Sequence, residues 1–169
     1  MVSRRARASG FPILTCVLLG VAIFASRVAA IDISISGDWT KTIDANDLSA
    51  GAGSDLISVH ESASDQGVIS IANTTDFSDG WRVDVSRTDT NWPGDFALYV
   101  KRTSDGTGNG GAIAGGYAFQ EVTTSSASLF SGTGDWSGID ICLKLAGVSL
   151  SAAPNTYSTT ITYTLVDMP

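Results

Sequence analysis

The sequence predicts an all-β protein, a single antiparallel β-sandwich of about seven to nine strands. Apolar and polar residues alternate over several segments, which is the pattern of strands with one buried face and one wet face. Turns rich in Gly, Asp, Asn and Pro separate these segments. Beyond residue 30 no segment has convincing helical periodicity, although the stretch "DANDLS" is a candidate for one helical turn.

Residues 1–30 have the three parts of a secretory signal peptide. Three arginines and no acid stand in the first ten residues, an apolar run follows, and the small residues Val28 and Ala30 precede the expected cleavage point. The apolar run is shorter than the roughly 20 residues of a membrane-spanning helix, so an uncleaved anchor is the less favoured alternative. We therefore expect a secreted protein at the extracellular cell surface, with residues 31–169 forming the β-sandwich domain.

The predicted strands follow one another along the mature chain, each with its core-facing side chains on one parity. Weaker strand patterns cover residues 56–61, 68–72, 117–123 and 127–130. The stronger patterns direct these residues toward the core: Ile31, Ile33, Ile35, Trp81, Val83, Val85, Phe96, Leu98, Val100, Ile139, Ile141, Leu143, Leu145, Tyr157, Thr159, Ile161, Tyr163 and Leu165. Cys142 has the opposite parity, so we expect its thiol on the outer face, open to reagents. The stretch "SDGTGNGGAIAGG" is interpreted as a flexible hairpin tip.

The charge of the mature chain limits its partners. Cleavage leaves six basic residues against 17 acidic ones, hence a net charge of −11. Such a surface repels phosphate backbones and anionic membranes, so neither nucleic acid nor membrane is an expected partner. The acidic turns around residues 44–55 and 76–79 offer oxygen ligands for structural calcium, but neither has the EF-hand register. Calcium is the only cofactor left open.

The sequence predicts neither an enzyme nor a catalytic residue. His60 is the only histidine, and no GxSxG or HExxH motif accompanies it, so we interpret it as a surface polar residue. The only glutamates are Glu61 and Glu121, and most aspartates lie in turns, where backbone hydrogen bonding favours them. No Cys/His spacing predicts a zinc site.

Trp92 in "NWPGD" and Trp136 in "GDWSG" stand in predicted turns. In one interpretation these two tryptophans stack on the sugar rings of a carbohydrate, so they are the candidate ligand-stacking residues. In the other interpretation they fold back and close the ends of the core, as large rings usually do.

Two segments resemble a known family. "GWRVDVSR" contains Trp81–Arg82–Val83, and the closing "YSTTITYTLV" contains Tyr163–Thr164–Leu165. This pairing resembles the WxL domains of Gram-positive cell-surface proteins, with Val83 in place of Leu and Tyr163 in place of Trp. The closing run is also similar to the last strand of secreted pilin-like subunits. The resemblance implies a β-sandwich at the bacterial surface that attaches to the cell wall non-covalently.

The opening segment "IDISIS", residues 31–36, leaves two interpretations open. It is the first strand of its own sandwich, or it is an arm whose Ile31, Ile33 and Ile35 fill a groove of the next subunit and add a strand to its sheet. Such head-to-tail addition produces filaments when it does not close. We therefore predict a non-enzymatic surface or structural subunit whose partner is a second copy. The alternative is a module that binds carbohydrate or cell wall through its loop tryptophans.

Overall fold

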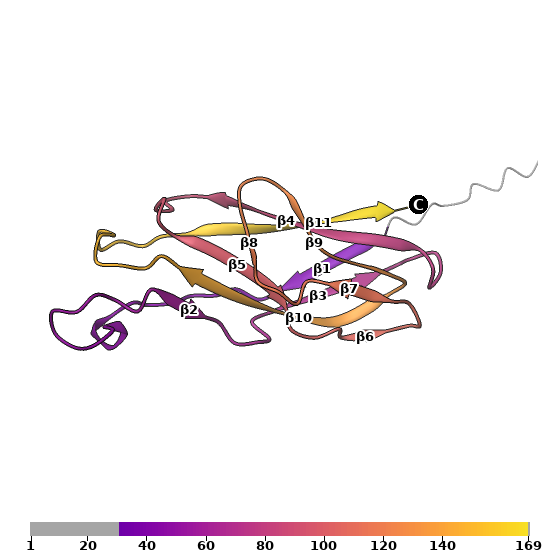
Figure 1. Cartoon of the computed structure of the whole chain (residues 1–169). Helices are drawn as coiled ribbons and strands as arrows, with labels where there is room; N and C mark the ends of the chain where they lie inside the picture. The colour runs from indigo at the N-terminus through magenta and orange to yellow at the C-terminus, as the bar shows by residue number, and fades with distance from the viewer. Residues whose placement is uncertain (1–30, 169) are drawn as a thin grey trace, which may run out of the picture.

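A computed structural model describes residues 31–168, and the predicted signal peptide lies outside them. The described chain forms two antiparallel sheets that lie one above the other as the layers of a sandwich (Figure 1). Within these residues, no helix combines the length and the apolar character that crossing a membrane requires. The all-β sandwich predicted from the alternation is thereby confirmed.

The larger sheet has seven strands and the smaller has four. The larger sheet follows the order β1 (Asp32–Ser36), β3 (Gly67–Ala72), β10 (Trp136–Ala146), β5 (Ala97–Arg102) and β8 (Gln120–Glu121), and β2 (Val59–Glu61) and β6 (Thr107–Gly108) also pair with β10. The smaller sheet follows the order β11 (Thr159–Met168), β4 (Gly80–Asp89), β9 (Ala127–Thr133) and β7 (Ile113–Gly115).

The strand count exceeds the prediction because of short strands. Residues 31–168 contain eleven strands, and β2, β6, β7 and β8 have only two or three residues each. Alternation over so few residues gives no recognisable pattern. Two of them, β6 and β7, lie in the Gly-rich stretch that was interpreted as a flexible hairpin tip, so that interpretation is wrong. The predicted helical turn is present as the 3-10 helix η1 (Ala45–Asp47), with a capping box between Asp44 and Asp47.

The core lies between the sheets and is built around Trp81, whose side chain is fully buried. Its indole nitrogen donates to the carbonyl of Gly134 at 2.8 Å, and its ring meets Phe130 edge-on at 6.0 Å. A Cβ on Gly132 would lie 2.6 Å from this ring, so the neighbouring strand needs glycine there. Val83, Val85, Val100, Ile139 and Ile141 are buried with the predicted parity. Ile69, Ile71 and Val122, which belong to the weaker strand patterns and had no predicted parity, are fully buried as well.

The expected exposure of Cys142 is wrong. Its side chain points away from the core, as the parity predicts, but only 3% of the residue is exposed. Ser62, which follows β2, covers it: the hydroxyl of Ser62 lies 3.7 Å from the Cys142 sulfur and accepts from the Leu143 amide at 2.8 Å. Both faces of β10 are therefore covered at this position.

We expect the Cys142 thiol to resist a thiol reagent in the native protein and to react fully once the chain is unfolded. The physical reason is access, because thiol chemistry needs an exposed thiolate. The measurement is the time course of labelling with and without denaturant, and the denatured sample is the control. Fast labelling of the native protein would mean that the segment around Ser62 leaves the sheet readily.

Candidate functional site

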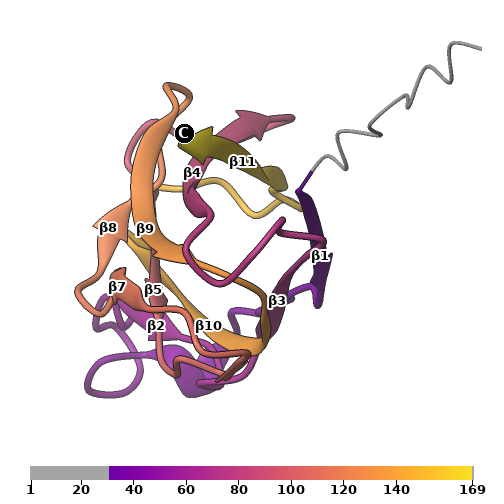
Figure 2. The ribbon, with the colours of Figure 1, turned by 90° about the vertical axis from the view of Figure 1, so that its right-hand side faces the viewer.

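One side of the sandwich is bordered by two strands that each have a single paired neighbour. Among residues 31–168, β1 pairs only with β3, and β11 pairs only with β4. Viewed along the sandwich, β1 and β11 are the two edges that face each other across this side (Figure 2). Their outward backbone groups are free to bond a further strand, which is the property of an exposed sheet edge.

A groove of about 1100 Å³ opens between the sheets on this side. Inward-facing side chains of both sheets line it, among them Phe96, Leu98, Leu143, Leu145, Ile161 and Tyr163. β11 is the clearest sign that the core is incomplete here, because none of its described residues is fully buried although its partner β4 buries Trp81, Val83 and Val85. The groove is thus a partly open region between the sheets, with apolar side chains of both sheets in its lining.

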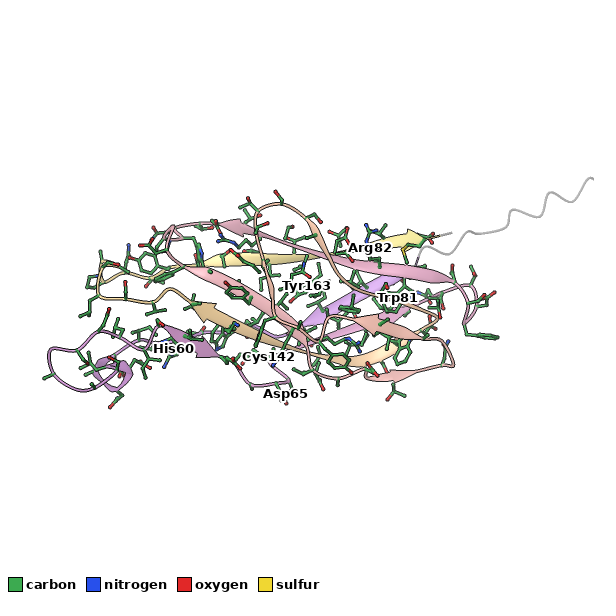
Figure 3. All side chains as sticks on the ribbon, viewed as in Figure 1. His60, Asp65, Trp81, Arg82, Cys142 and Tyr163 are labelled. Atoms are coloured by element: carbon green, nitrogen blue, oxygen red, sulfur yellow. The ribbon has the colours of Figure 1, made fainter. Side chains whose placement is uncertain are left out.

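Leu143 and Leu145 show where the core ends. Ile139 and Ile141 precede them on β10 with the same parity and are buried, although Ile141 also borders the groove, whereas Leu143 and Leu145 line the groove and are only half-buried. Tyr163 stands opposite, between the two sheets (Figure 3). Burial raises the pKa of its hydroxyl above the ordinary value, so this side chain contributes no charge to the groove.

The opposite end of β5 is sealed, in contrast to the groove. Leu98 in β5 and Phe96, which precedes the strand, are buried but border the groove, whereas Arg102 at the other end of β5 is 1% exposed and lies outside it. The guanidinium of Arg102 donates to the carbonyl of Gly115 at 2.7 Å, pairs with Asp105, and stacks on Tyr117 at 4.1 Å. This end of the sandwich is therefore closed by the loop of Asp105 and Tyr117, whereas the groove leaves the other end partly open.

The opening strand is fully paired with β3 of its own subunit in this structure, but its isoleucine face is only partly buried there. Its register places Ile33 opposite Ile71 and Ile35 opposite Ile69 of β3, and the Asp32 carboxylate accepts from Asn73 at 2.6 Å. Ile31 and Ile33 pack against the core while remaining half-buried, and Ile35 is 45% exposed and borders the groove. The segment is thus an edge strand with one apolar side chain largely in water.

Gly37 ends this strand at a conformational break. Its φ is +107°, and a Cβ there would clash with the carbonyl of Gln66, so the position needs glycine. The following residues 38–43 make no backbone-to-backbone hydrogen bond within the described chain, although Gln66 donates to the carbonyl of Asp38. Trp39 and Ile43 are half-buried in this segment, and both line the groove.

The two candidate stacking tryptophans are both folded against the protein. The Trp92 indole donates to the carbonyl of Phe96 at 2.9 Å and packs edge-on against the Phe96 ring, beside the groove. The Trp136 indole donates to the carbonyl of Thr133 at 2.9 Å, and its ring covers Gly108 so closely that a Cβ there would lie 2.7 Å away. Neither ring stands clear of the surface as a stacking platform does.

The expected surface position of His60 is wrong. His60 is 8% exposed, whereas its strand neighbours Val59 and Glu61 are exposed. Its Nδ1 lies 3.8 Å from the Asp47 carboxylate of η1, which also binds Lys41 at 2.7 Å, and Figure 3 places His60 where β2 meets this loop. Hydrogen bonding to Lys41 holds the pKa of Asp47 below its ordinary value. The cluster joins η1 to β2.

The structure gives no cation site to the acidic turns. Asp76 accepts from Ser78, and Asp79 accepts from Thr75, so their oxygens already have partners within the turn. Among residues 31–168, no group of three or more His, Cys, Asp or Glu side chains is arranged to hold a metal ion. Glu61 and Glu121 are exposed on two different strands.

No protein-family model, curated protein or solved structure matches this chain. The resemblance to WxL and pilin-like domains therefore stays a prediction. The fold and the groove define the chain as a β-sandwich with one open apolar side and an edge strand that begins the described residues.

Proposed function

We propose that this protein is a non-enzymatic extracellular structural subunit that assembles into filaments by donating its opening strand. In the assembled state, residues 31–36 of one copy leave their own β3 and enter the groove of the next copy. There they pair with the free edge of β11 and insert Ile31, Ile33 and Ile35 between the sheets. The observation that carries the proposal is the groove between the sheets, which has apolar side chains in its lining, a free edge at β11, and the isoleucine-bearing edge strand β1 beside it.

Burial provides the driving force. On its own subunit the strand leaves Ile35 45% exposed and Ile31 and Ile33 half-buried, while Leu143, Leu145 and Ile161 remain partly exposed in the groove. Full burial of an isoleucine side chain contributes about 1.5–3 kcal/mol. When the opening strand leaves β3, it loses its backbone hydrogen bonds there and forms a similar number with β11 of the next copy. The net free energy of hydrogen bonding therefore changes little, and the added apolar burial favours the exchange.

The geometry of this contact is head-to-tail. The donated strand and the accepting groove are different surfaces of the same molecule, so each copy can give one strand and take another. The chain carries Ile31, Ile33 and Ile35 on one parity and Asp32, Ser34 and Ser36 on the other, which suits a strand with one buried and one wet face. A contact of this kind grows into a filament unless the rotation between copies closes a ring.

The carbohydrate-binding alternative receives no comparable support. It depends on Trp92 and Trp136, and both indoles hydrogen-bond to backbone carbonyls of their own loops. We propose a second copy of this chain as the partner instead.

The test is the state of purified residues 31–169 as the protein concentration rises. We expect sedimentation to show a shift from monomer to large polymers, and electron microscopy to show unbranched filaments. Because each subunit carries a net charge of −11, assembly should be faster at higher ionic strength, where repulsion between subunits is screened. A protein that stays monomeric at every concentration and ionic strength contradicts the proposal.

A further inference from the structure

We propose that residues 37–44, here called the strap, occupy the groove in the free subunit and withhold it until the subunit has donated its own strand. This inference rests on the proposed strand donation and adds its regulation. Trp39 and Ile43 of the strap line the groove and are half-buried, so their side chains cover part of the apolar surface that an incoming strand needs.

The strap is held by side chains and little else. Within the described chain, residues 38–43 have no backbone-to-backbone hydrogen bonds, in contrast to the full ladder of the preceding strand. Its links are the Gln66 bond to the Asp38 carbonyl and the Lys41 ion pair with Asp47. A segment bound in this way leaves at lower cost than a paired strand, because no ladder has to break.

The strap contributes two apolar side chains to the groove. Trp39 and Ile43 both line it, although Gly37 interrupts the strand before them and the strap has no strand pairing. The strap therefore covers apolar surface of the groove with side chains alone, without the backbone pairing of an added strand. It is a partial occupant that a complete strand can replace.

Donation of the opening strand and exposure of the groove are coupled through Gly37. The strap is continuous with the opening strand at this residue, so the strap of a donating subunit is drawn out of the groove when its strand moves to a neighbour. The groove of the donating subunit then becomes free for the strand of the next copy. This coupling predicts that isolated subunits resist assembly and that the ends of existing filaments accept new subunits readily, which is growth with a lag phase.

The experiment measures binding of a labelled "IDISIS" peptide to a subunit whose own strand is fixed in place. The opening strand is fixed by an oxidised Ser34→Cys/Ser70→Cys disulfide, because Ser34 and Ser70 are directly opposed on β1 and β3. In this background the strap variant Trp39→Ser/Ile43→Ser should bind the peptide at least about tenfold more tightly than the unchanged strap, because the apparent affinity scales with the fraction of open groove. Phe77→Ser is the matched control, since Phe77 is 64% exposed and lies outside the groove.

The outcomes separate the two proposals. Equal peptide affinity for the strap variant and the unchanged strap overturns the strap inference and leaves strand donation standing. Absence of peptide binding to both, with the fold intact by circular dichroism, contradicts the groove as acceptor and therefore the proposed function itself. If the double variant does not fold, Ile43→Ser alone gives the same comparison, and without the disulfide it should shorten the lag before filaments appear. An unchanged lag in that variant also overturns the strap inference.

Discussion

Ile33→Asp should abolish filament formation while leaving a folded monomer. Ile33 is the central apolar side chain of the donated strand, and in the groove it would lie among Leu143, Leu145 and Ile161. A carboxylate buried there without a partner costs at least about 3 kcal/mol, which raises the concentration needed for assembly by at least about 100-fold. On its own subunit the same residue is half-buried at a sheet edge, so the charge can reach water and the fold persists.

Ser34→Asp is the matched control for this change. It adds the same charge one position along the strand, on the exposed face that points away from the groove in the donated strand. Sedimentation should show polymers for Ser34→Asp and monomers for Ile33→Asp, with the same circular dichroism for both. Filaments of Ile33→Asp at the wild-type concentration would show that the isoleucine face is not the contact.

Mixing two defective subunits tests the direction of the contact. Ile33→Asp impairs the donated strand and leaves its groove intact, whereas Leu143→Asp places a charge in the groove and leaves the strand intact. Each variant alone should remain monomeric. An equimolar mixture of Leu143→Asp with Ile33→Asp/Ile43→Ser, in which the weakened strap no longer withholds the accepting groove, should give heterodimers and no longer species, because only one productive strand–groove pair exists between them.

The fold class could be predicted from the sequence because the long strands alternate over many residues. β4, β10 and β11 each have ten or eleven residues, and their parity predicts correctly which side chains point inward. The parity gives the direction of a side chain but not the depth at which it lies. Ile139 and Leu145 therefore have the same pattern in the sequence, although one is buried and the other borders a groove.

The errors at Cys142 and His60 have the same physical cause. The side chains of both residues alternate with those of their strand neighbours, as the sequence predicts. Other segments of the chain cover them: Ser62 covers Cys142, and the η1 loop covers His60. Local alternation contains no information on which loop returns over a sheet. The burial of these two side chains therefore could not be predicted from the sequence.

The sequence predicts a groove only as the acceptor in one interpretation of the opening segment, and it does not predict where the groove lies. Trp39 and Ile43 follow the isoleucines at odd positions, but the break at Gly37 means that alternation does not give the direction of their side chains. The sequence does not show that backbone pairing stops at Ser36, nor that β11 keeps a free edge. Both depend on the spacing between the two sheets, which is set by how the whole core packs.

A reversible lock on the opening strand should switch assembly off and on. Ser34 and Ser70 are cross-strand partners, and the Cα atoms of such pairs lie about 4.5–5.5 Å apart, within the range that a disulfide spans. Oxidised Ser34→Cys/Ser70→Cys therefore ties the strand to its own β3 without changing the groove. The buried Cys142 is covered by Ser62 and does not compete for the new cysteines.

The control lock is Ser86→Cys/Thr162→Cys, which ties β4 to β11 at another opposed pair. Both side chains point away from the core, and the free edge of β11 and the opening strand remain unchanged. The oxidised control should assemble as well as its reduced form. Any loss of assembly in the control would measure the effect of a disulfide in itself.

The most direct measurement is the sedimentation of one Ser34→Cys/Ser70→Cys sample before and after addition of a reducing agent. We expect monomers in the oxidised sample and filaments after reduction, because donation requires the strand to leave β3. Filaments in the oxidised sample, at the same concentration and rate as in the reduced one, would contradict strand donation as the basis of assembly.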